Sequence, residues 1–527
     1  MSQSGQRRMG GQPMFILSED SERTRGDDAQ SSNISAGKAV SESVRTTLGP
    51  RGMDKMLVSD DGDVVITNDG ATILNEMDIE HPAAQMLVEV AETQEDEVGD
   101  GTTTASILAG ELLSQAENLL EDDVHPTTIV EGYHEASEIA KAAIEDAVIA
   151  TDPDDDQLIQ VAESSMTGKG TGELAAEDLA RTVVNAVQQV STDAGVDRKA
   201  ISVHTQVGAS SSATELVEGV IVDEERLSEE MARSVEDAAI AIIEEDLEVK
   251  EANIDAEYQV TNVDQLNAAI EAETGQLQEY AQALADSNAD VVFIDGDVDD
   301  RVTAELVKSG LLVFDSVDSD TVESVRAATG ASRVGSVDSL EDDDLGHAER
   351  LSVEKYADDE LVFIEGGAES EAVTIFARGS TKHVVDELER SLNDALDVVT
   401  AALDAGGVLA GAGAIEIEIA DRIRSEAAGI QGRKQLAVEA YADAVDVIPR
   451  TLAENTGMDP IDALVDLRAE HDTGATAGLI SEGQTGIIAD PIEYGVLDPA
   501  AVKREAVESA TEASTMIVRI DDVIASN

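Results

Sequence analysis

The sequence predicts a multidomain protein of mixed α+β and α/β architecture, in which a helical domain made from both ends of the chain carries inserted α/β domains. The length of 527 residues leaves room for about three or four domains. The first and last thirds are rich in alanine and carry apolar residues at helical spacing. Between them, short apolar runs alternate with helical segments, which is typical of βαβ units.

The N-terminal third is expected to be helical from Ser32 to about Ala150, with a short hairpin at Asp63–Leu74. Alternation in Val64-Val65-Ile66 and the turn signal Asn68-Asp69-Gly70 predict the hairpin. The acidic, proline-containing segment Thr151–Asp156 predicts the first domain boundary.

Two α/β regions are expected next, ending near Val222 and near Gly367. The second contains strands at Asp290–Ile294 and Gly310–Phe314 with a helix at Val302–Lys308 between them, so we expect these strands to be parallel.

The clearest helix is predicted at Lys382–Asp404, where apolar residues recur every three or four positions: Val385, Leu388, Leu392, Ala395, Val399 and Leu403. Helices are expected to return from Ala414 to Asp466 and from Pro499 to Met516.

The charge is extreme, with 112 acidic against 34 basic residues and a formal net charge of −78. Periodic apolar residues and dispersed acids argue against a disordered acidic chain. At about 1 M salt the Debye length falls to ~3 Å, which screens the self-repulsion of such a surface. We interpret the chain as an intracellular protein of a very salty cytoplasm that does not bind nucleic acid.

Other classes of site and location are excluded by composition. The chain has no cysteine, and its seven histidines show no metal-ligand spacing, so disulfides and zinc or iron centres are not expected. No stretch reaches the ~18 apolar residues of a membrane span, and Met14–Leu17 is too short for a signal peptide. We therefore expect a cytoplasmic protein without a membrane partner.

Three short segments combine glycine and hydroxyl residues with a fixed charge: Thr46–Lys55, Asn68–Thr72 and Gly99–Thr104. Glycine lets a backbone approach phosphate oxygens, and hydroxyls with consecutive N–H groups can hold an anion. An adjacent aspartate suits Mg²⁺, which takes one or two protein carboxylates together with phosphate oxygens. These segments predict a Mg-ATP site, although both a Walker P-loop and a Rossmann fingerprint are absent.

These three segments closely resemble segments of group II chaperonins, the archaeal thermosome and its eukaryotic cytosolic relative. Further matching segments follow one another along the chain in the order that the family has. With the charge, the resemblance implies a haloarchaeal member. The further matching segments are Glu22–Gly26, Met166–Gly170, Asp386–Arg390 with Asn393–Leu396, Gln435–Ala440, Val447–Asn455, Tyr494–Pro499, Ser509–Ala513 and Arg519–Ile524.

The resemblance implies an ATP-hydrolysing chaperonin subunit that encloses and folds non-native proteins in a double ring of eight- or nine-membered rings, homo- or hetero-oligomeric. It implies three domains: an equatorial ATP-binding domain (1–150 and 405–527), an intermediate hinge domain (151–222 and 368–404) and an apical client-binding domain (223–367). The helical protrusion that serves as a built-in lid is placed at about 246–288.

Residues at the matching positions are expected to bind Mg-ATP, with K⁺ as a further candidate cation. The phosphate contacts are Thr47, Leu48, Gly49, Pro50, Gly101, Thr102, Thr103 and Thr104, and the magnesium ligand is Asp100. The residues expected to act in hydrolysis are Asp69 and Asp394, which orient the attacking water, and Lys169, which senses the γ-phosphate. The base and ribose contacts are Gly411 and Glu493.

Three of these residues also have an ordinary structural interpretation. Asp100 is equally suited to cap the helix that follows, and Asp69 to form an Asn-Asp-Gly turn. Asp394 could form an exposed i,i+4 pair with Arg390.

The sequence departs from the family in two places. Ala412 stands where the family has the second of three glycines, and its Cβ is expected to narrow the adenine pocket. Basic residues of the apical region are replaced by acids, as in Asp295–Asp300.

The proposed lid helix has few apolar residues. Leu266, Ile270, Leu277 and Leu284, with Gly275 between them, are expected to contact neighbouring lids or clients and not to form a core.

Two alternative functions remain open. One is a ring subunit with weak ATPase activity that acts mainly as a structural or client-binding member. The other is a Mg-ATP phosphotransferase of small molecules, for which no acceptor motif is found.

Lowering the KCl concentration is expected to dissociate the particle before its helices unfold, because a net charge of −78 per chain multiplies around a ring and is screened only by cations. Light scattering and circular dichroism against KCl concentration measure the two events. Rings that persist in dilute buffer without Mg²⁺ or nucleotide would contradict this interpretation of the acidic surface.

Overall fold

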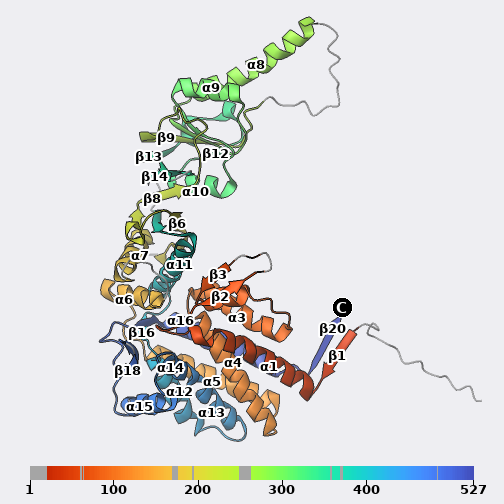
Figure 1. The fold of residues 1–527 in the computed structure, drawn as a ribbon, viewed down its shortest axis with the longest axis vertical. Helices are drawn as coiled ribbons and strands as arrows, with labels where there is room; N and C mark the ends of the chain where they lie inside the picture. The colour runs from red at the N-terminus through yellow and green to blue at the C-terminus, as the bar shows by residue number, and fades with distance from the viewer. Residues whose placement is uncertain are drawn as a thin grey trace, which may run out of the picture.

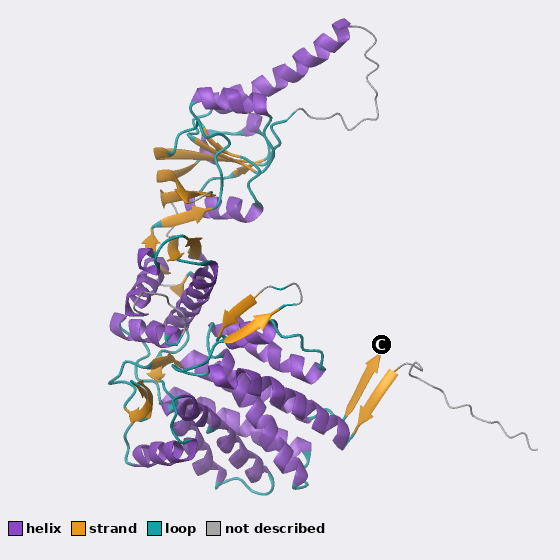
Figure 2. Ribbon diagram, in the orientation of Figure 1, coloured by secondary structure: helices purple, strands orange, loops and turns teal. Residues whose placement is uncertain are grey.

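The computed structural model describes residues 21–59, 62, 64–168, 176–192, 195–248, 263–356, 359–367, 372–483 and 485–526. The molecule is elongated, with a helical base, a small middle body and an upper body built around a sheet (Figures 1 and 2). Both ends of the described chain lie in the base.

The base has the largest hydrophobic core, and segments from both ends of the chain contribute to it. Alanine, valine, leucine and isoleucine dominate this core, as the aromatic-poor composition predicts. Its helices are α1 (Asp27–Val44), α2 (Gly70–Asn75), α3 (Pro82–Val98), α4 (Thr102–Glu121), α5 (Pro126–Asp146), α12 (Ala414–Ala427), α13 (Lys434–Val445), α14 (Val447–Asn455), α15 (Pro460–Asp472) and α16 (Ala500–Val518).

Small residues let the base helices approach one another closely. A Cβ on Gly110 of α4 would lie 2.2 Å from the Cβ of Ser41 on α1, so glycine is needed where these helices cross. The largest buried side chains, Tyr133 and Tyr441, meet edge to face with ring centroids 5.6 Å apart. The Tyr133 hydroxyl donates to the Leu112 carbonyl oxygen at 2.8 Å, which satisfies its buried polar group.

Four two-stranded antiparallel sheets border the base. The pairs are β1 (Ser21–Arg25) with β20 (Asp522–Ser526), β2 (Lys55–Val58) with β3 (Val64–Thr67), β16 (Val408–Ala410) with β19 (Leu497–Pro499), and β17 (Gly478–Glu482) with β18 (Thr485–Ala489). The first pair joins the two ends of the described chain.

The middle body packs three helices, α6 (Asp155–Met166), α7 (Ala176–Val190) and α11 (Lys382–Asp404), around a core of its own. Its three-stranded sheet has the order β6 (Ile201–Val207), β15 (Val373–Gly379), β7 (Glu215–Val217), with a small β4 (Ser191–Thr192) and β5 (Gly195–Val196) pair beside it. The predicted helix at Lys382–Asp404 is confirmed, and most of its predicted apolar stripe is buried.

The upper body contains a seven-stranded mixed sheet among the described residues, with the order β11-β10-β9-β13-β14-β8 and β12 beside β9. The predicted parallel pair is confirmed: β10 and β11 are parallel with α9 between them. The elements are β8 (Gly219–Val222), β9 (Ser234–Ile243), α8 (Val263–Asp286), β10 (Val291–Ile294), α9 (Asp300–Ser309), β11 (Leu312–Phe314), α10 (Ser319–Thr329), β12 (Arg333–Val334), β13 (Gly346–Tyr356) and β14 (Asp359–Gly367).

The hairpin predicted at Asp63–Leu74 is wrong, although Val64–Ile66 does lie in a strand. This strand, β3, pairs with the preceding β2, and the predicted turn at Asn68–Gly70 is instead the start of α2. Asp69 caps this helix, because its Oδ2 accepts from the Thr72 N–H at 2.6 Å. The same residue types favour turns and helix N-caps, so only the tertiary contacts decide between them.

Helix α8 projects beyond the upper sheet at the end of the molecule farthest from the base (Figure 1). It runs through Gly275 without a break, because a glycine inside a helix costs only about 1 kcal/mol relative to alanine. The expectation that its apolar residues avoid a core is wrong for its second half, since Leu277 and Leu284 are 3% and 0% exposed within the upper core. The side chains of Leu266 and Ile270 lie outside the described residues.

Replacing Leu284 with alanine is expected to destabilise the upper body by about 3 kcal/mol, because it removes a fully buried side chain and leaves a cavity. Thermal unfolding in molar KCl measures the change. Val465→Ala is the matched control, since Val465 is 58% exposed and its loss should have little effect. If the thermal unfolding transition of Leu284→Ala were unchanged, this half of α8 would not be part of the core.

Candidate functional site

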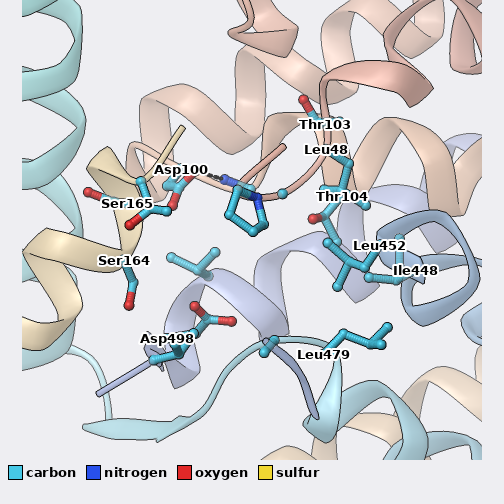
Figure 3. Close-up of a pocket in the computed structure, with 18 of the residues that line it drawn as sticks. Leu48, Asp100, Thr103, Thr104, Ser164, Ser165, Ile448, Leu452, Leu479 and Asp498 are labelled. Atoms are coloured by element: carbon cyan, nitrogen blue, oxygen red, sulfur yellow. Dashed lines mark hydrogen bonds between the residues drawn. The ribbon is translucent and has the colours of Figure 1, made fainter. Parts of the chain in front are cut away.

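A cavity of about 560 Å³ lies between the base and the end of α6, and most of the predicted nucleotide-binding residues line it (Figure 3). This volume is typical of small-molecule and cofactor sites. The predicted residues among its lining are Thr47, Leu48, Gly49, Pro50, Asp69, Asp100, Gly101, Thr102, Thr103 and Thr104.

The loop that begins at Thr47 is held from two sides. The Thr47 hydroxyl lies 3.4 Å from the Thr103 hydroxyl, so this loop meets the start of α4. Asn455 of α14 donates from Nδ2 to the Leu48 carbonyl oxygen at 2.9 Å. Gly49 has a φ of 84°, and a Cβ there would lie 2.4 Å from a leucine side chain of α14. The loop therefore needs glycine and has a defined shape before any ligand binds.

The N-terminus of α4 opens into the cavity. Gly101 is its N-cap, with a φ of 84° and no side-chain cap, and the first turn contains no acidic residue. The first N–H groups of a 20-residue helix are thus available to an anion. Asp100 is therefore not the cap that the sequence suggested, and its Oδ1 accepts from the Gly101 N–H at 2.7 Å.

Gln94, a fully buried residue of α3, positions the Asp100 loop. Its Nε2 donates to the Asp100 carbonyl oxygen at 2.7 Å and to the Val502 carbonyl oxygen at 3.2 Å. The loop is therefore tied to both chain ends. Sequence reasoning missed Gln94, since a single glutamine in a helix carries no local signal.

Asp69 faces the same space from the start of α2. Its Oδ1 accepts from the Thr102 hydroxyl at 3.3 Å, while Oδ2 caps α2. Gly70 makes this approach possible, because a Cβ there would lie 2.6 Å from the Thr103 hydroxyl. Asp69 is therefore both a helix cap and a carboxylate fixed beside the N-terminus of α4.

Asp394 lies on α11 and is only 6% exposed, so it does not form the exposed pair with Arg390 that the sequence also suggested. Arg390 forms an ion pair with Glu387 at 2.9 Å. Three residues further along α11, Asp397 packs on the loop before Asp100. A Cβ at Gly99 would lie only 2.1 Å from the Asp397 Cβ. The helix that carries Asp394 is thus in direct contact with the cavity's Asp100 loop, although Asp394 is not among the lining residues.

The other predicted site residues lie around the cavity or outside the described residues. Lys169 lies outside the described residues. The carbonyl oxygen of its neighbour Gly168 accepts from the Asn68 Nδ2 at 2.8 Å. Gly411 and Glu493 are not among the lining residues, whereas Ala412 and Tyr494, next to them, are.

Several lining residues were not found from the sequence. Ser164, Ser165 and Thr167 bring hydroxyls from the end of α6, and Asp498 with Lys503 comes from the β19–α16 segment. Figure 3 shows Ser164, Ser165 and Asp498 on the side of Asp100. Asp498-Pro499 resembles an ordinary helix start, so its sequence does not reveal this position.

An apolar wall lies across the cavity from these polar groups (Figure 3). Ile448 and Leu452, one turn apart on α14, and Leu479 on β17 form it together with Ala412. Ala412 has a φ of 56°, a left-handed conformation that favours glycine. Alanine in place of the family's glycine at position 412 therefore strains the backbone and also adds a methyl group to the wall.

Comparisons with known proteins identify the family of this chain. The model of the TCP-1/cpn60 chaperonin family matches residues 40–527. The chain belongs to the TCP-1/cpn60 chaperonin family. Thermosome subunit 3 of Haloferax volcanii is 63% identical over 517 residues, covering 98% of this chain and 99% of the relative. Thermosome subunit alpha of Halobacterium salinarum is 53% identical over 520 residues, covering 98% of this chain and 92% of the relative.

A thermosome subunit of Methanopyrus kandleri is 50% identical over 522 residues, covering 98% of this chain and 95% of the relative. The resemblance to group II chaperonins is thereby confirmed, and with it an ATP-hydrolysing chaperonin of mixed α/β multidomain fold. None of the described helices has the length and apolar character needed to cross a membrane.

The described residues also fit Mg²⁺ bound together with a nucleotide. They include no group of three or more potential metal ligands among His, Asp and Glu. A magnesium ion bound with phosphates needs only one or two protein carboxylates, and Asp100 and Asp69 both line the cavity.

Replacing Ala412 with glycine is expected to stabilise the base by about 1 kcal/mol, because glycine adopts a positive φ without a Cβ clash. Thermal unfolding and the KM for ATP are the measurements, and we expect KM to stay equal or fall. Gly413→Ala, with a φ of 79°, is the opposite change next to it and should destabilise. A loss of stability in Ala412→Gly would show that this backbone is relaxed around alanine.

Proposed function

We propose that this chaperonin subunit binds Mg-ATP in the cavity, with the phosphates against the Thr47–Pro50 loop and the N-terminus of α4. One observation carries the proposal: that loop, the uncapped helix end and the carboxylates of Asp69 and Asp100 converge on one space. Helix N–H groups and glycine backbone bind anions, and the carboxylates accept a cation.

Asp100 would hold Mg²⁺, which neutralises charge on the phosphates when bound. Asp69 and Asp394 would orient the attacking water, since phosphoryl transfer depends mainly on positioning and charge neutralisation. The contact of Asp397 with the Asp100 loop supports this role for Asp394. Lys169, the neighbour of Gly168 in the sequence, would sense the γ-phosphate, and K⁺ is a further candidate cation beside the phosphates.

The adenosine would lie against the apolar wall of Ile448, Leu452 and Leu479. Asp498, 25% exposed, is a carboxylate on the lining of the cavity. A carboxylate repels phosphates, so it would face the neutral sugar and accept from a hydroxyl group. Gly411 and Glu493 would support this end of the site from behind Ala412 and Tyr494.

The three bodies would be the three domains that the resemblance implies. The base would be the equatorial domain (1–150 and 405–527), the middle body the intermediate domain (151–222 and 368–404), and the upper body the apical domain (223–367). The projecting half of α8 would belong to the lid protrusion proposed at about 246–288, whereas the second half of α8 packs in the upper core.

Exposed apolar residues on the β2–β3 hairpin support assembly. Met56, Val58, Val64 and Ile66 are 67%, 64%, 36% and 38% exposed on a two-stranded sheet, a structure that is marginal alone. A neighbouring subunit would cover it within a double ring. Haloferax volcanii has relatives described as thermosome subunits 1, 2 and 3, which favours hetero-oligomeric rings.

The clients would be non-native proteins, enclosed in the cytoplasm by ATP-driven closure. The alternative of a ring member with weak ATPase activity has one supporting observation, the strained Ala412 in the cavity wall. The rate of ATP turnover by the assembled particle distinguishes an ATP-driven chaperonin from a ring member with weak ATPase activity.

Replacing Asp394 with alanine is expected to lower ATP turnover by about 100-fold or more, with nucleotide binding and assembly retained. Turnover and ADP binding by the particle in molar KCl are the measurements. Asp404→Ala, at the exposed end of the same helix, is the matched control. Asp100→Ala should instead weaken Mg-ATP binding itself. Unchanged turnover in Asp394→Ala would remove this residue from the reaction.

A further inference from the structure

The guanidinium group of Arg198 ties the sheet of the middle body to one face of α11. Arg198 begins the short 3₁₀ turn Arg198–Ala200, directly before β6. Its Nε is 2.5 Å from Asp397 Oδ1, its Nη2 donates to Asn393 Oδ1 at 3.0 Å, and its Nη1 donates to the Ile201 carbonyl oxygen at 3.0 Å. All three guanidinium nitrogens thus have an acceptor, and two of these acceptors are side chains one turn apart on α11.

Asp397 extends this connection to the base. Its Oδ1 contacts Arg198, whereas a Cβ on Gly99 would lie 2.1 Å from the Asp397 Cβ and 3.0 Å from its Oδ2. Gly99 ends α3 with a φ of 68°, so both its backbone conformation and its surroundings favour glycine. The next residue is Asp100, the proposed magnesium ligand. One carboxylate therefore stands between Arg198 of the middle body and the Asp100 loop of the base.

Asp394 lies within the turn of α11 that Arg198 holds. It directly follows Asn393 and precedes Asp397 by three residues. The guanidinium is a planar fork that fixes the direction of its acceptors. Two such contacts, one turn apart, restrict both the rotation of α11 about its axis and its translation along that axis. The position of Asp394 relative to the Asp100 loop therefore depends on Arg198.

The Arg198–Asp397 contact differs from an ordinary surface ion pair. The two side chains are only 28% and 34% exposed. Burial raises the pKa of Asp397, although the charge and hydrogen bond of Arg198 act to lower it. Removing the arginine would leave a partly buried carboxylate without this counter-ion. Exposed pairs contribute little to stability, whereas this pair lies where α11 meets the base.

We propose that Arg198 is a positioning residue for ATP hydrolysis, which holds α11 so that Asp394 keeps a fixed place relative to the Asp100 loop. This inference rests on the proposed Mg-ATP site and on the proposed role of Asp394. Arg198 does not line the cavity, so it does not touch the nucleotide. It therefore acts on turnover and leaves nucleotide affinity largely unchanged.

The test measures ATP turnover and calorimetric ADP affinity of the assembled particle in molar KCl with Mg²⁺. Arg198→Met should lower kcat about tenfold, because small displacements of reacting groups are costly, while KM and ADP affinity stay within about threefold. Arg198→Lys keeps a positive charge without the fork, so its kcat should be intermediate. Arg181→Met is the matched control, since it removes an exposed 2.8 Å arginine–glutamate pair from α7 of the same body and should leave kcat unchanged.

Two double variants separate positioning from folding. Arg198→Met/Asp397→Asn removes the carboxylate charge that the single variant would leave uncompensated, and keeps the shape of the side chain against Gly99. It should recover assembly and thermal stability, but not kcat. Arg198→Met/Asp394→Ala should turn over no more slowly than Asp394→Ala, because the effects of residues that act through one another are not additive.

The outcomes distinguish this inference from the proposed function. If wild type binds no ADP, or if Asp394→Ala keeps full turnover, the proposed function is wrong. If Asp394→Ala loses turnover while Arg198→Met keeps it, only the role of Arg198 is wrong. A loss of ADP affinity with unchanged kcat, or a loss that multiplies with that of Asp394→Ala, would also overturn this role. Recovery of kcat together with stability in Arg198→Met/Asp397→Asn would make Arg198 only a structural counter-ion.

Discussion

The packing of α4 between helices from both ends of the chain is the constraint on which the rest depends. This helix contacts α1 and α3 from the N-terminal segment and α13 and α16 from the C-terminal segment. Its core side chains, such as Leu112 and Leu113, are fully buried. This packing holds its N-terminus at the cavity, so the hydrogen-bond donors of its first turn are in place before a ligand arrives. Preorganised donors of this kind favour an anion without reorganisation.

Electrostatics divides this chain into an acidic exterior and a few internal cations. Of its 34 basic residues, Arg226 and Lys503 are largely covered opposite carboxylates, and Arg424 and Arg468 are partly covered. Arg424 and Arg468 both contact the fully buried Asp446, and Arg226 holds Glu360 at 2.6 Å in the upper body. Burial raises the pKa of Asp446 despite these arginines, so removing either would leave a poorly compensated charge. Salt screens the exterior, but it cannot replace these internal pairs.

Helix α11 is the physical connection between the cavity and the bodies above it. Its first turn packs near β15, where a Cβ on Gly379 would lie 2.6 Å from Val385, and further along Asp397 presses on the Asp100 loop. Arg198, from the turn before β6, is 2.5 Å from the same Asp397 and also donates to Asn393 at 3.0 Å. A helix held at both places links the Asp100 loop of the cavity to the three-stranded sheet of the middle body.

Periodicity and motif order in the sequence were sufficient for the mixed α/β fold, the helix at Lys382–Asp404, the parallel pair of β10 and β11, and the loops at Thr47 and Asp100. Apolar spacing determines which face of an element is buried, and glycine determines where backbone must approach a neighbour. Only the tertiary structure decided that Asn68–Gly70 begins a helix, that Leu277 and Leu284 of α8 are core, and that Asp498 and Lys503 join the site. Each depends on contacts between segments far apart in the chain, such as that of Glu416 with Lys503, which are 87 positions apart, and local sequence carries no record of such contacts.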